Sequence, residues 1–415
     1  MKNISRKNPV FFAYIVFATL LFAFKPTLSD QLDSESFRNV VFSFNVDPML
    51  VFIGCSMVFV IVNLKSFNYD YILLLLITSS VLGLIPLIYS SQNNYLGNYF
   101  PLLFSVITYF ILLQSDNNIE KSIRKIFIFC ILIISGQVIY SEWKIFSSLS
   151  FGNFNLLSAK GNLAIPIGSS NLIACFLLPM IIFIFLSKRS LWSNLTCFIG
   201  LYALVLCRSK NALIILLLCI AVLPFIKFIK KVYLDRNLSK NKKLCIFITI
   251  FFCFLFCMNF VFEISNFIIS DLSFNYFSSL SNPLLNHLDR ISSGRVTVIL
   301  DQFKSTEMHY VFGNGFSYEL GQSKSHNWLI DLIVQRGFVG LMLYIFCLML
   351  IISQSKPYLF DRVVRNLIII WSIILIQGLF EISLFTAGID FLFWTISAVI
   401  MSRIRGLKLK ELKDN

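Results

Sequence analysis

Residues 201–218 read LYALVLCRSKNALIILLL, two apolar runs that meet at a short polar turn of Arg208, Ser209 and Lys210. Runs of this kind are typical of helices that cross a lipid bilayer in opposite directions. The whole chain shares this composition, because 57% of its 415 residues are hydrophobic and only 13% are charged. A mean hydropathy of +0.79 excludes an ordinary soluble protein of this length. The sequence therefore predicts an all-α integral membrane protein.

Apolar segments of roughly 20 residues recur along the chain and predict about twelve transmembrane helices. These segments lie near 9–25, 48–64, 70–90, 98–114, 126–143, 165–187, 191–207, 211–228, 244–266, 337–355, 366–383 and 389–402. The predicted organisation has three parts. Residues 1–266 carry helices one to nine, residues 267–336 form one large loop, and residues 337–415 carry the last three helices and a tail.

The distribution of basic residues predicts the orientation of these helices. With both termini in the cytoplasm, most of the 35 basic residues fall on the cytoplasmic side, as the positive-inside rule requires. The large loop and the turn at Arg208 then face the opposite side of the membrane. This bias also accounts for the net charge of +14, so nucleic acid is not expected as a partner. The ten cysteines fall in or beside apolar segments, which argues against a disulfide framework or a zinc site.

The large loop contains all three histidines, His287, His309 and His326. An amphipathic helix is expected after Ser292–Ser293, and the sequence GNGF at 313–316 predicts a turn. Ser325 is a candidate N-cap of the next helix, with His326 and Asn327 in its first turn. Gly337 and Gly340 mark the expected entry of that chain segment into the bilayer.

Four cations on the predicted outer side run against the charge bias. Arg208 and Lys210 could clamp a phosphate or pyrophosphate group, since arginine offers bidentate contacts, or they could reach out to lipid phosphates. Arg290 and Arg295 could provide a second phosphate contact, or they could simply be solvated residues at a helix start. The sequence of each pair alone does not distinguish phosphate binding from contact with lipid or water.

His326 is the candidate general base. A histidine at a helix N-terminus is disfavoured as a cation, so it stays neutral and can accept a proton from a sugar hydroxyl. Its alternative is a local hydrogen-bonding role, and we interpret His287 and His309 as ordinary loop residues. Asn171, early in the segment at 165–187, could line a cavity or belong to its helix start. No cluster of histidines and carboxylates predicts a metal site.

The order of five short motifs is more informative than any of them alone. An R-x-x-x-A-L turn (Arg208–Leu213) is followed by S-G-R (Ser293–Arg295), G-N-G (Gly313–Gly315), H-N-x-L-x-D (His326–Asp331) and G-x-x-G (Gly337–Gly340). This arrangement resembles the O-antigen ligase and O-antigen polymerase family of bacterial envelope membrane proteins. The resemblance covers roughly residues 165–345 in motifs and the whole chain in topology.

The resemblance implies a GT-C-like membrane glycosyltransferase of the bacterial inner membrane, with its active site facing the periplasm. It implies an undecaprenyl-pyrophosphate-linked glycan as donor and no cofactor or metal ion. A chain-length regulator and a flippase of the same pathway are the implied protein partners. The family's essential residues would correspond to Arg208, Arg295 and His326. The remaining predicted substrate-binding residues are Arg290, Lys210, Asn327, Asn171, Gly313 and Gly315.

Several functions remain open at this point. A polymerase, which joins lipid-linked repeat units, is favoured over a ligase, which transfers the glycan to lipid A-core. A polysaccharide flippase or exporter would also have many helices, but it predicts charged residues at mid-membrane on several of them. A structural envelope scaffold would leave Arg208 and His326 without a role.

Overall fold

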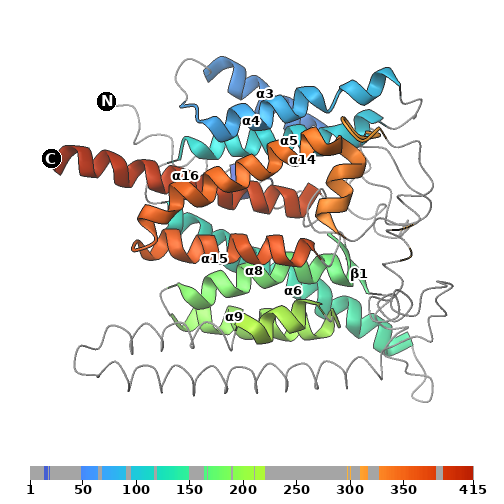
Figure 1. Cartoon of the computed structure of the whole chain (residues 1–415). Helices are drawn as coiled ribbons and strands as arrows, with labels where there is room; N and C mark the ends of the chain where they lie inside the picture. Colours follow the sequence, from blue (N-terminus) through green and yellow to red (C-terminus); the bar gives the residue numbers. More distant parts are fainter. Residues whose placement is uncertain are drawn as a thin grey trace, which may run out of the picture.

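The computed structural model is mostly helical (Figure 1). It describes residues 14–16, 18, 48–63, 68–89, 95–115, 119–148, 163–165, 167–187, 190–209, 211–219, 297, 300, 309–315, 327–379 and 387–414. Its helices are α3 (Pro48–Asn63), α4 (Tyr71–Leu82), η2 (Ile85–Ile88), α5 (Tyr95–Leu113), α6 (Ile119–Ser148), α8 (Ser170–Leu186), α9 (Leu191–Leu206), α14 (Trp328–Ser355), η3 (Lys356–Tyr358), α15 (Arg362–Gly378) and α16 (Ala387–Asp414). Two short strands, β1 (Ala164–Ile165) and β2 (Gly168–Ser169), pair antiparallel and directly precede α8 in the sequence.

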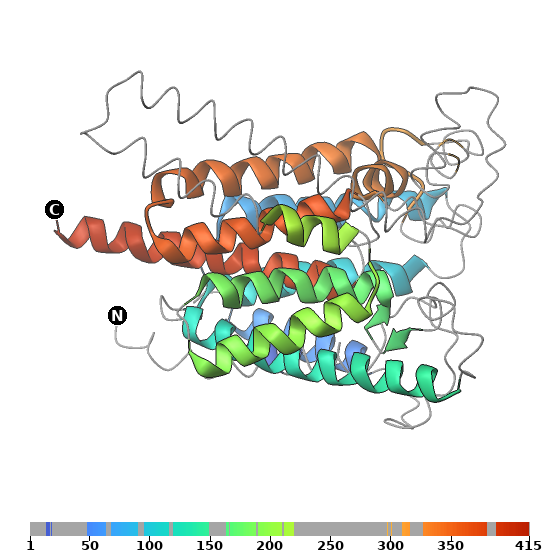
Figure 2. The same cartoon turned by 90° about the horizontal axis from the view of Figure 1, so that it is seen from below.

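The long helices run side by side, and neighbours in sequence run in opposite directions (Figure 1). Helices α3, α4, α5 and α14 lie on one side, and α6, α8 and α9 form a layer on the other (Figures 1 and 2). Helices α15 and α16 lie between these groups. We call the end that carries the Cys207–Ser209 turn, the β1–β2 hairpin and the 309–315 turn the turn end. The opposite end, toward which α16 runs to the C-terminus, is the tail end.

The described interior is apolar with scattered polar side chains, and long stretches of three helices are enclosed by it. Residues 104–113 of α5, 173–184 of α8 and 389–402 of α16 are all buried. Polar contacts join these helices to their neighbours: the Trp371 indole N–H donates to the hydroxyl of Ser397 at 3.0 Å. A helix that is apolar on all sides belongs in the core of a bundle or in a bilayer, which explains the central place of α8.

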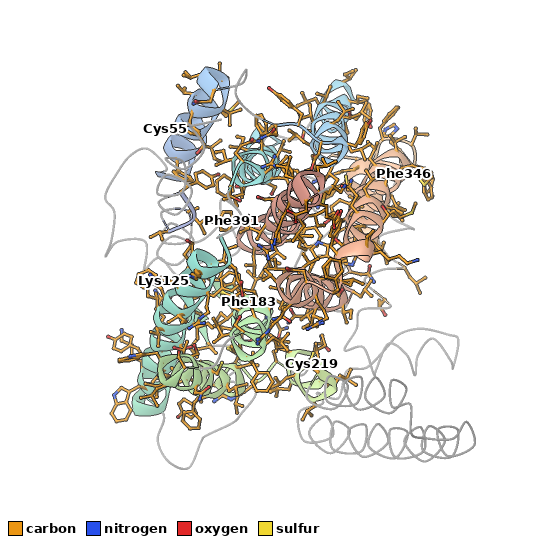
Figure 3. The ribbon with its side chains drawn as sticks, turned by 90° about the vertical axis from the view of Figure 1, so that its left-hand side faces the viewer. Cys55, Lys125, Phe183, Cys219, Phe346 and Phe391 are labelled. Carbon is orange, nitrogen blue, oxygen red and sulfur yellow. The ribbon has the colours of Figure 1, made fainter. Side chains whose placement is uncertain are left out.

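The peripheral helices turn large apolar side chains outward. Phe183 and Phe391 lie in the middle of the bundle, whereas Phe346 lies at its edge and is 47% exposed (Figure 3). The outward residues follow helical spacing, and examples are Leu195, Phe198, Tyr202 and Val205 on α9 and Phe338, Met342, Phe346 and Met349 on α14. By length and composition, two described helical stretches, Glu120–Lys144 and Trp328–Tyr358, could cross a membrane.

Several predicted segments agree closely with the observed helices. The segments at 48–64 and 191–207 correspond to α3 and α9, and the all-helical prediction is confirmed in its coarse form. The start of the segment at 165–187 was wrong, because residues 164–169 form a hairpin rather than the start of a helix. Helix α14 begins at Trp328, within three residues of the helix start predicted at Ser325. The segment at 244–266 lies outside the described residues, as do most of the segment at 9–25 and most of the large loop.

Candidate functional site

The charged side chains that the structure buries lie at the turn end. Among the described residues they are Glu142 near the end of α6, Asp331 and Arg336 near the start of α14, and Asp390 near the start of α16. Arg208 joins them from the turn after α9, with 13% of its side chain exposed. Burying a charge costs free energy unless it is paired or hydrogen-bonded, so these residues mark the end of the bundle where function is best sought.

Arg208 forms a two-pronged ion pair with Glu142. Its Nη1 lies 2.5 Å from Oε1 of Glu142, and its Nη2 lies 2.9 Å from Oε2. Nη1 also donates to the carbonyl of Leu206, the last residue of α9, at 3.1 Å. The two side chains are 13% and 11% exposed. This bidentate geometry is the strongest form of charge-assisted hydrogen bonding, and it offsets the cost of removing both groups from water.

The backbone at Arg208 is unusual as well. Its φ is +50°, and it is the one non-glycine residue in the described part of the chain with a positive φ. This conformation is disfavoured for residues with a Cβ by roughly 1–2 kcal/mol. The turn is closed by main-chain bonds from Cys207 to Ala203 and from Arg208 to Val205, both at 3.0 Å. A side chain held in a strained turn against a buried partner is typical of a functional position.

The turn that contains the GNG motif hydrogen-bonds to helix α14 where that helix is interrupted. Gly337 has φ +64° and ψ −170°, which interrupts the helix between Arg336 and Phe338. The 309–315 turn fits into the gap and bonds to both sides of it. The four hydrogen bonds run from Asn314 N to Val334 O (2.8 Å), from Gly315 N to Gln335 O (3.0 Å), from Phe338 N to Tyr310 O (2.8 Å) and from Val339 N to Val311 O (3.1 Å). We call this arrangement the clasp, since it satisfies backbone groups that the break leaves open.

Glycine is required at two positions of the clasp. A Cβ on Gly313 would overlap the backbone of Gln335, and a Cβ on Gly337 would overlap the carbonyl of Val311. Both residues also have positive φ. Gly313 and Gly315 were predicted to bind substrate; the structure gives each a backbone role, and their contact with a substrate stays a prediction.

Tyr89, which follows η2, covers the clasp from the side of α4. Its hydroxyl donates to the carbonyl of Gly313 at 2.6 Å, and its ring centroid lies 4.1 Å from that of His309. The main-chain N–H of His309 donates to Oδ1 of Asn314 at 3.0 Å. His309 is exposed and belongs to the clasp, in keeping with its interpretation as a loop residue.

A second set of polar groups lies beneath the clasp. Nη1 of Arg336 is 3.4 Å from the hydroxyl of Ser79 on α4, and the Ser105 hydroxyl of α5 donates to Asp390. Tyr344 on α14 lies within electrostatic range of both Arg336 and Asp390. Each of these two buried charges therefore has a polar neighbour on another helix, which reduces the cost of its burial. This cluster connects the clasp to α4, α5 and α16.

Asn327 is the N-cap of α14, which corrects the prediction of Ser325 for that position. Its Oδ1 accepts hydrogen bonds from the N–H groups of Leu329 (3.0 Å) and Ile330 (3.4 Å). Its Nδ2 donates to the carbonyl of Leu379, just after α15, at 3.2 Å. The amide therefore bridges the start of one helix and the end of another, and Asn327 caps the helix instead of lying in its first turn. Asn171 lies in the first turn of α8. Its predicted contact with a substrate stays a prediction.

The structure brings only some of the predicted residues together. Lys210, Arg290, Arg295 and His326 lie outside the described residues. Arg208 bonds to neither Asn327 nor Gly313 within the part of the chain that is described. The main residue that the sequence interpretation missed is Glu142. It is a lone carboxylate at the predicted outer end of an apolar segment, and such a residue calls for a cationic partner at the same depth.

The described residues contain no group of three or more His, Cys, Asp and Glu side chains that could hold a metal ion. No protein family model matches the chain, and no curated protein matches it. The site must therefore be interpreted from its own residues.

Proposed function

We propose that this chain is an integral membrane glycosyltransferase that joins undecaprenyl-pyrophosphate-linked repeat units into an O-antigen or similar surface polysaccharide. In this proposal it spans the bacterial inner membrane about twelve times in a GT-C-like fold, with both termini in the cytoplasm. The turn end then faces the periplasm, where a lipid-linked donor and acceptor meet. A chain-length regulator and a flippase of the same pathway are the proposed protein partners.

The Arg208 turn carries this proposal. An arginine that is nearly buried between two apolar helices, in a strained turn and with a fixed guanidinium, suits recognition of a phosphate at a membrane surface. In the reaction, an acceptor hydroxyl attacks the anomeric carbon of the donor, and the pyrophosphate leaves with the electron pair of the broken C–O bond. Arginines neutralise the charge that develops on this leaving group. His326 takes the hydroxyl proton, and a single displacement inverts the anomeric carbon.

Membrane insertion is supported by the surface and by the charges of the described residues. The outward faces of α4, α9 and α14 are apolar at helical spacing, which suits contact with lipid. Among the described cations, only Lys144, Arg208 and Arg336 lie at the turn end. The cations of the α6 start, the α14–α15 connection and the α16 tail all lie at the opposite end. This division follows the positive-inside rule with the tail end in the cytoplasm.

The position of the buried charges favours an enzyme over a flippase or exporter. A transporter would place charged residues along a path through the middle of the membrane. The described buried charges instead lie near one end of their helices, the end that carries the Arg208 turn. A site at one surface of the membrane suits transfer between two lipid-linked substrates that both reach that surface.

The proposal is tested by deleting the gene and separating the lipopolysaccharide on a gel. A polymerase deletion leaves lipid A-core bearing a single repeat unit. A ligase deletion leaves core alone, with lipid-linked polymer accumulating in the membrane. An unchanged ladder would contradict both activities.

Complementation with point variants then tests the residues. We expect Arg208→Ala and His326→Ala to leave the single-repeat pattern, because each removes a group that acts on the reacting atoms or on the leaving group. Lys121→Ala, an exposed cation at the tail-end start of α6, is the matched control and restores the full ladder. Near-normal chain length with His326→Ala would exclude its role as general base.

A further inference from the structure

Glu142 determines which edge of Arg208 remains available. A guanidinium group carries five N–H donors in one plane: one on Nε and two on each Nη. Both donors of Nη1 are used, one by Oε1 of Glu142 and one by the Leu206 carbonyl. One donor of Nη2 is used by Oε2 of Glu142. Within the described part of the chain, the Nε donor and the second Nη2 donor have no partner.

These two remaining donors point in the same direction. They form the side edge of the guanidinium, a fork whose spacing matches two oxygens of one carboxylate or phosphate. Glu142 occupies the other fork, at the tip of the group. Because Nη1 is also tied to the carbonyl that ends α9, the plane of the guanidinium is fixed at two points. The arginine is therefore held in one orientation, with one complete fork unused by the residues that the structure describes.

The charge balance of the pair leads to a specific expectation. Glu142 cancels the formal charge of Arg208, so net charge alone gives the pair little attraction for an anion. Simple electrostatics predicts that removing Glu142 would strengthen anion binding at this turn. A positioning role predicts the opposite, since an unanchored arginine must be ordered when the ligand binds and this lowers affinity. The two effects have opposite signs and can be separated by experiment.

We propose that Glu142 is a positioning residue that holds Arg208 by its tip and presents the Nε–Nη2 edge to two oxygens of a pyrophosphate group. The inference rests on the proposed function, which supplies the pyrophosphate, and it adds a residue that touches the substrate only through Arg208. It also explains why a carboxylate lies where an anion is to bind. The carboxylate fixes direction, and the open fork provides the contact.

The test measures the affinity of farnesyl pyrophosphate, a short isoprenyl pyrophosphate, for the full-length protein in detergent micelles by isothermal titration calorimetry. Glu142→Gln keeps the size of the side chain but can accept only at one of its two terminal atoms. Glu120→Gln makes the same charge change at the other end of α6 and is the matched control. Gly200→Ala is the structural control, because its Cβ would lie 2.9 Å from Ile131 and Ile181 and disturb the packing of α6, α8 and α9.

We expect Glu142→Gln to weaken binding about three- to tenfold, the cost of ordering one long side chain upon binding. Glu120→Gln should bind as wild type does. Gly200→Ala should lower the unfolding temperature without changing the affinity, which distinguishes positioning from a general structural role. If Glu142→Gln is not monodisperse, Glu142→Asp carries the same prediction, since it keeps the charge and changes the reach.

Unchanged or tighter binding by Glu142→Gln overturns the positioning role. Arg208→Ala distinguishes a failure of the phosphate contact from a failure of the Glu142 positioning role. If Arg208→Ala loses binding while Glu142→Gln does not, the phosphate site stands and only the role of Glu142 fails. If Arg208→Ala binds like wild type, or if wild type does not bind the probe, no pyrophosphate contact exists at this turn and both proposals fail.

Discussion

The two ends of the bundle use arginine differently. At the tail end, Arg362 donates to the carbonyl of Leu186 at 2.7 Å, and Arg405 donates to the carbonyl of Leu113 at 2.6 Å. Each of these carbonyls belongs to the last residue of a helix, α8 or α5. At the turn end, Arg208 also donates to the last residue of its helix, but a second fork of the same guanidinium has no partner among the described residues. The first two contacts cap helices, whereas the third is one of several contacts of Arg208.

Basic residues at the two ends are stabilised in different ways. Cations near helix C-termini satisfy carbonyl groups and the helix dipole, so their presence at the tail end needs no further function. In the proposed orientation, a cation at the opposite end lacks support from the positive-inside rule and must be stabilised locally. Glu142 supplies that stabilisation for Arg208. The buried carboxylate partner, more than the arginine itself, marks the position as unusual.

The positive φ angles of the described residues all lie at the turn end, and Gly337→Ala tests this feature with the largest expected effect. The new Cβ would overlap the Val311 carbonyl and would stand at a φ of +64°. Strain of 1–2 kcal/mol and a comparable packing cost predict destabilisation of about 3 kcal/mol. Thermal or denaturant unfolding of the purified protein in detergent measures it.

Gly136→Ala, in the middle of α6, is the control for this change. A Cβ at Gly136 would meet nothing within 4 Å, so alanine should leave stability unchanged or raise it slightly. Equal effects of the two substitutions would show that the clasp contributes nothing to stability.

Double-mutant cycles compare the ion pairs at the two ends directly. The turn-end cycle uses Glu142→Gln and Arg208→Gln, and the tail-end cycle uses Asp361→Asn and Arg403→Gln. The Glu142–Arg208 pair is bidentate and more buried, so we expect a coupling free energy of about 2 kcal/mol. The Arg403–Asp361 pair has one contact of 2.8 Å with side chains 24% and 13% exposed, and about 0.5 kcal/mol is expected.

Unfolding free energies of the six variants and wild type provide both couplings. A tail-end coupling equal to or larger than the turn-end value would show that the Glu142–Arg208 pair is not the stronger of the two ion pairs.

Local patterns in the sequence predicted those features that depend on local forces. Apolar runs located α3 and α9 to within a residue, because hydropathy directly decides which segments enter an apolar environment. The same patterns predicted the start of α14 to within three residues but gave no sign of its break at Gly337, since that break is closed by hydrogen bonds to a turn more than twenty residues earlier in the chain. Helix α6 extends beyond its apolar run at both ends, because its polar first turns can be helical outside the apolar layer.

The site was predictable in part for a similar reason. Arg208 stood out because charge is rare between apolar segments. Its partner Glu142 lies 66 residues away, and no spacing rule connects two residues on different helices. A search for carboxylates at the same predicted depth as each outer cation would have proposed this pair.

Arg405→Ala tests whether the tail-end arginines have a role beyond capping. Loss of the 2.6 Å hydrogen bond to the Leu113 carbonyl should destabilise the protein by about 1 kcal/mol. The lipopolysaccharide ladder should stay complete in cells that carry this variant, in contrast to the single-repeat pattern expected for Arg208→Ala. A shortened ladder with Arg405→Ala at normal protein level would mean that function is not confined to the turn end.

The smallest expected effect is a pH dependence at the tail end, centred on Asp361 at the start of α15. Burial of this carboxyl raises its pKa, but Arg403 and the N–H groups of Val363 and Val364 more than offset this, so the pKa is lowered below its ordinary value. A lowered pKa means that the contribution to stability is complete above the unfolded-state pKa of about 3.9 and is lost as the pH falls through the folded-state value.

Asp361→Asn isolates this contribution, because an asparagine can still cap α15 but cannot form the ion pair with Arg403. The stability difference between wild type and Asp361→Asn should stay constant from pH 8 to pH 5 and shrink below about pH 4. Its size should stay under about 1 kcal/mol, because water screens a pair that is this exposed. A difference that instead grew as the pH fell would mean that Asp361 is stabilised in its protonated form. The Arg403–Asp361 ion pair would then add nothing to stability, and the contrast with the Glu142–Arg208 pair at the turn end would be larger than expected.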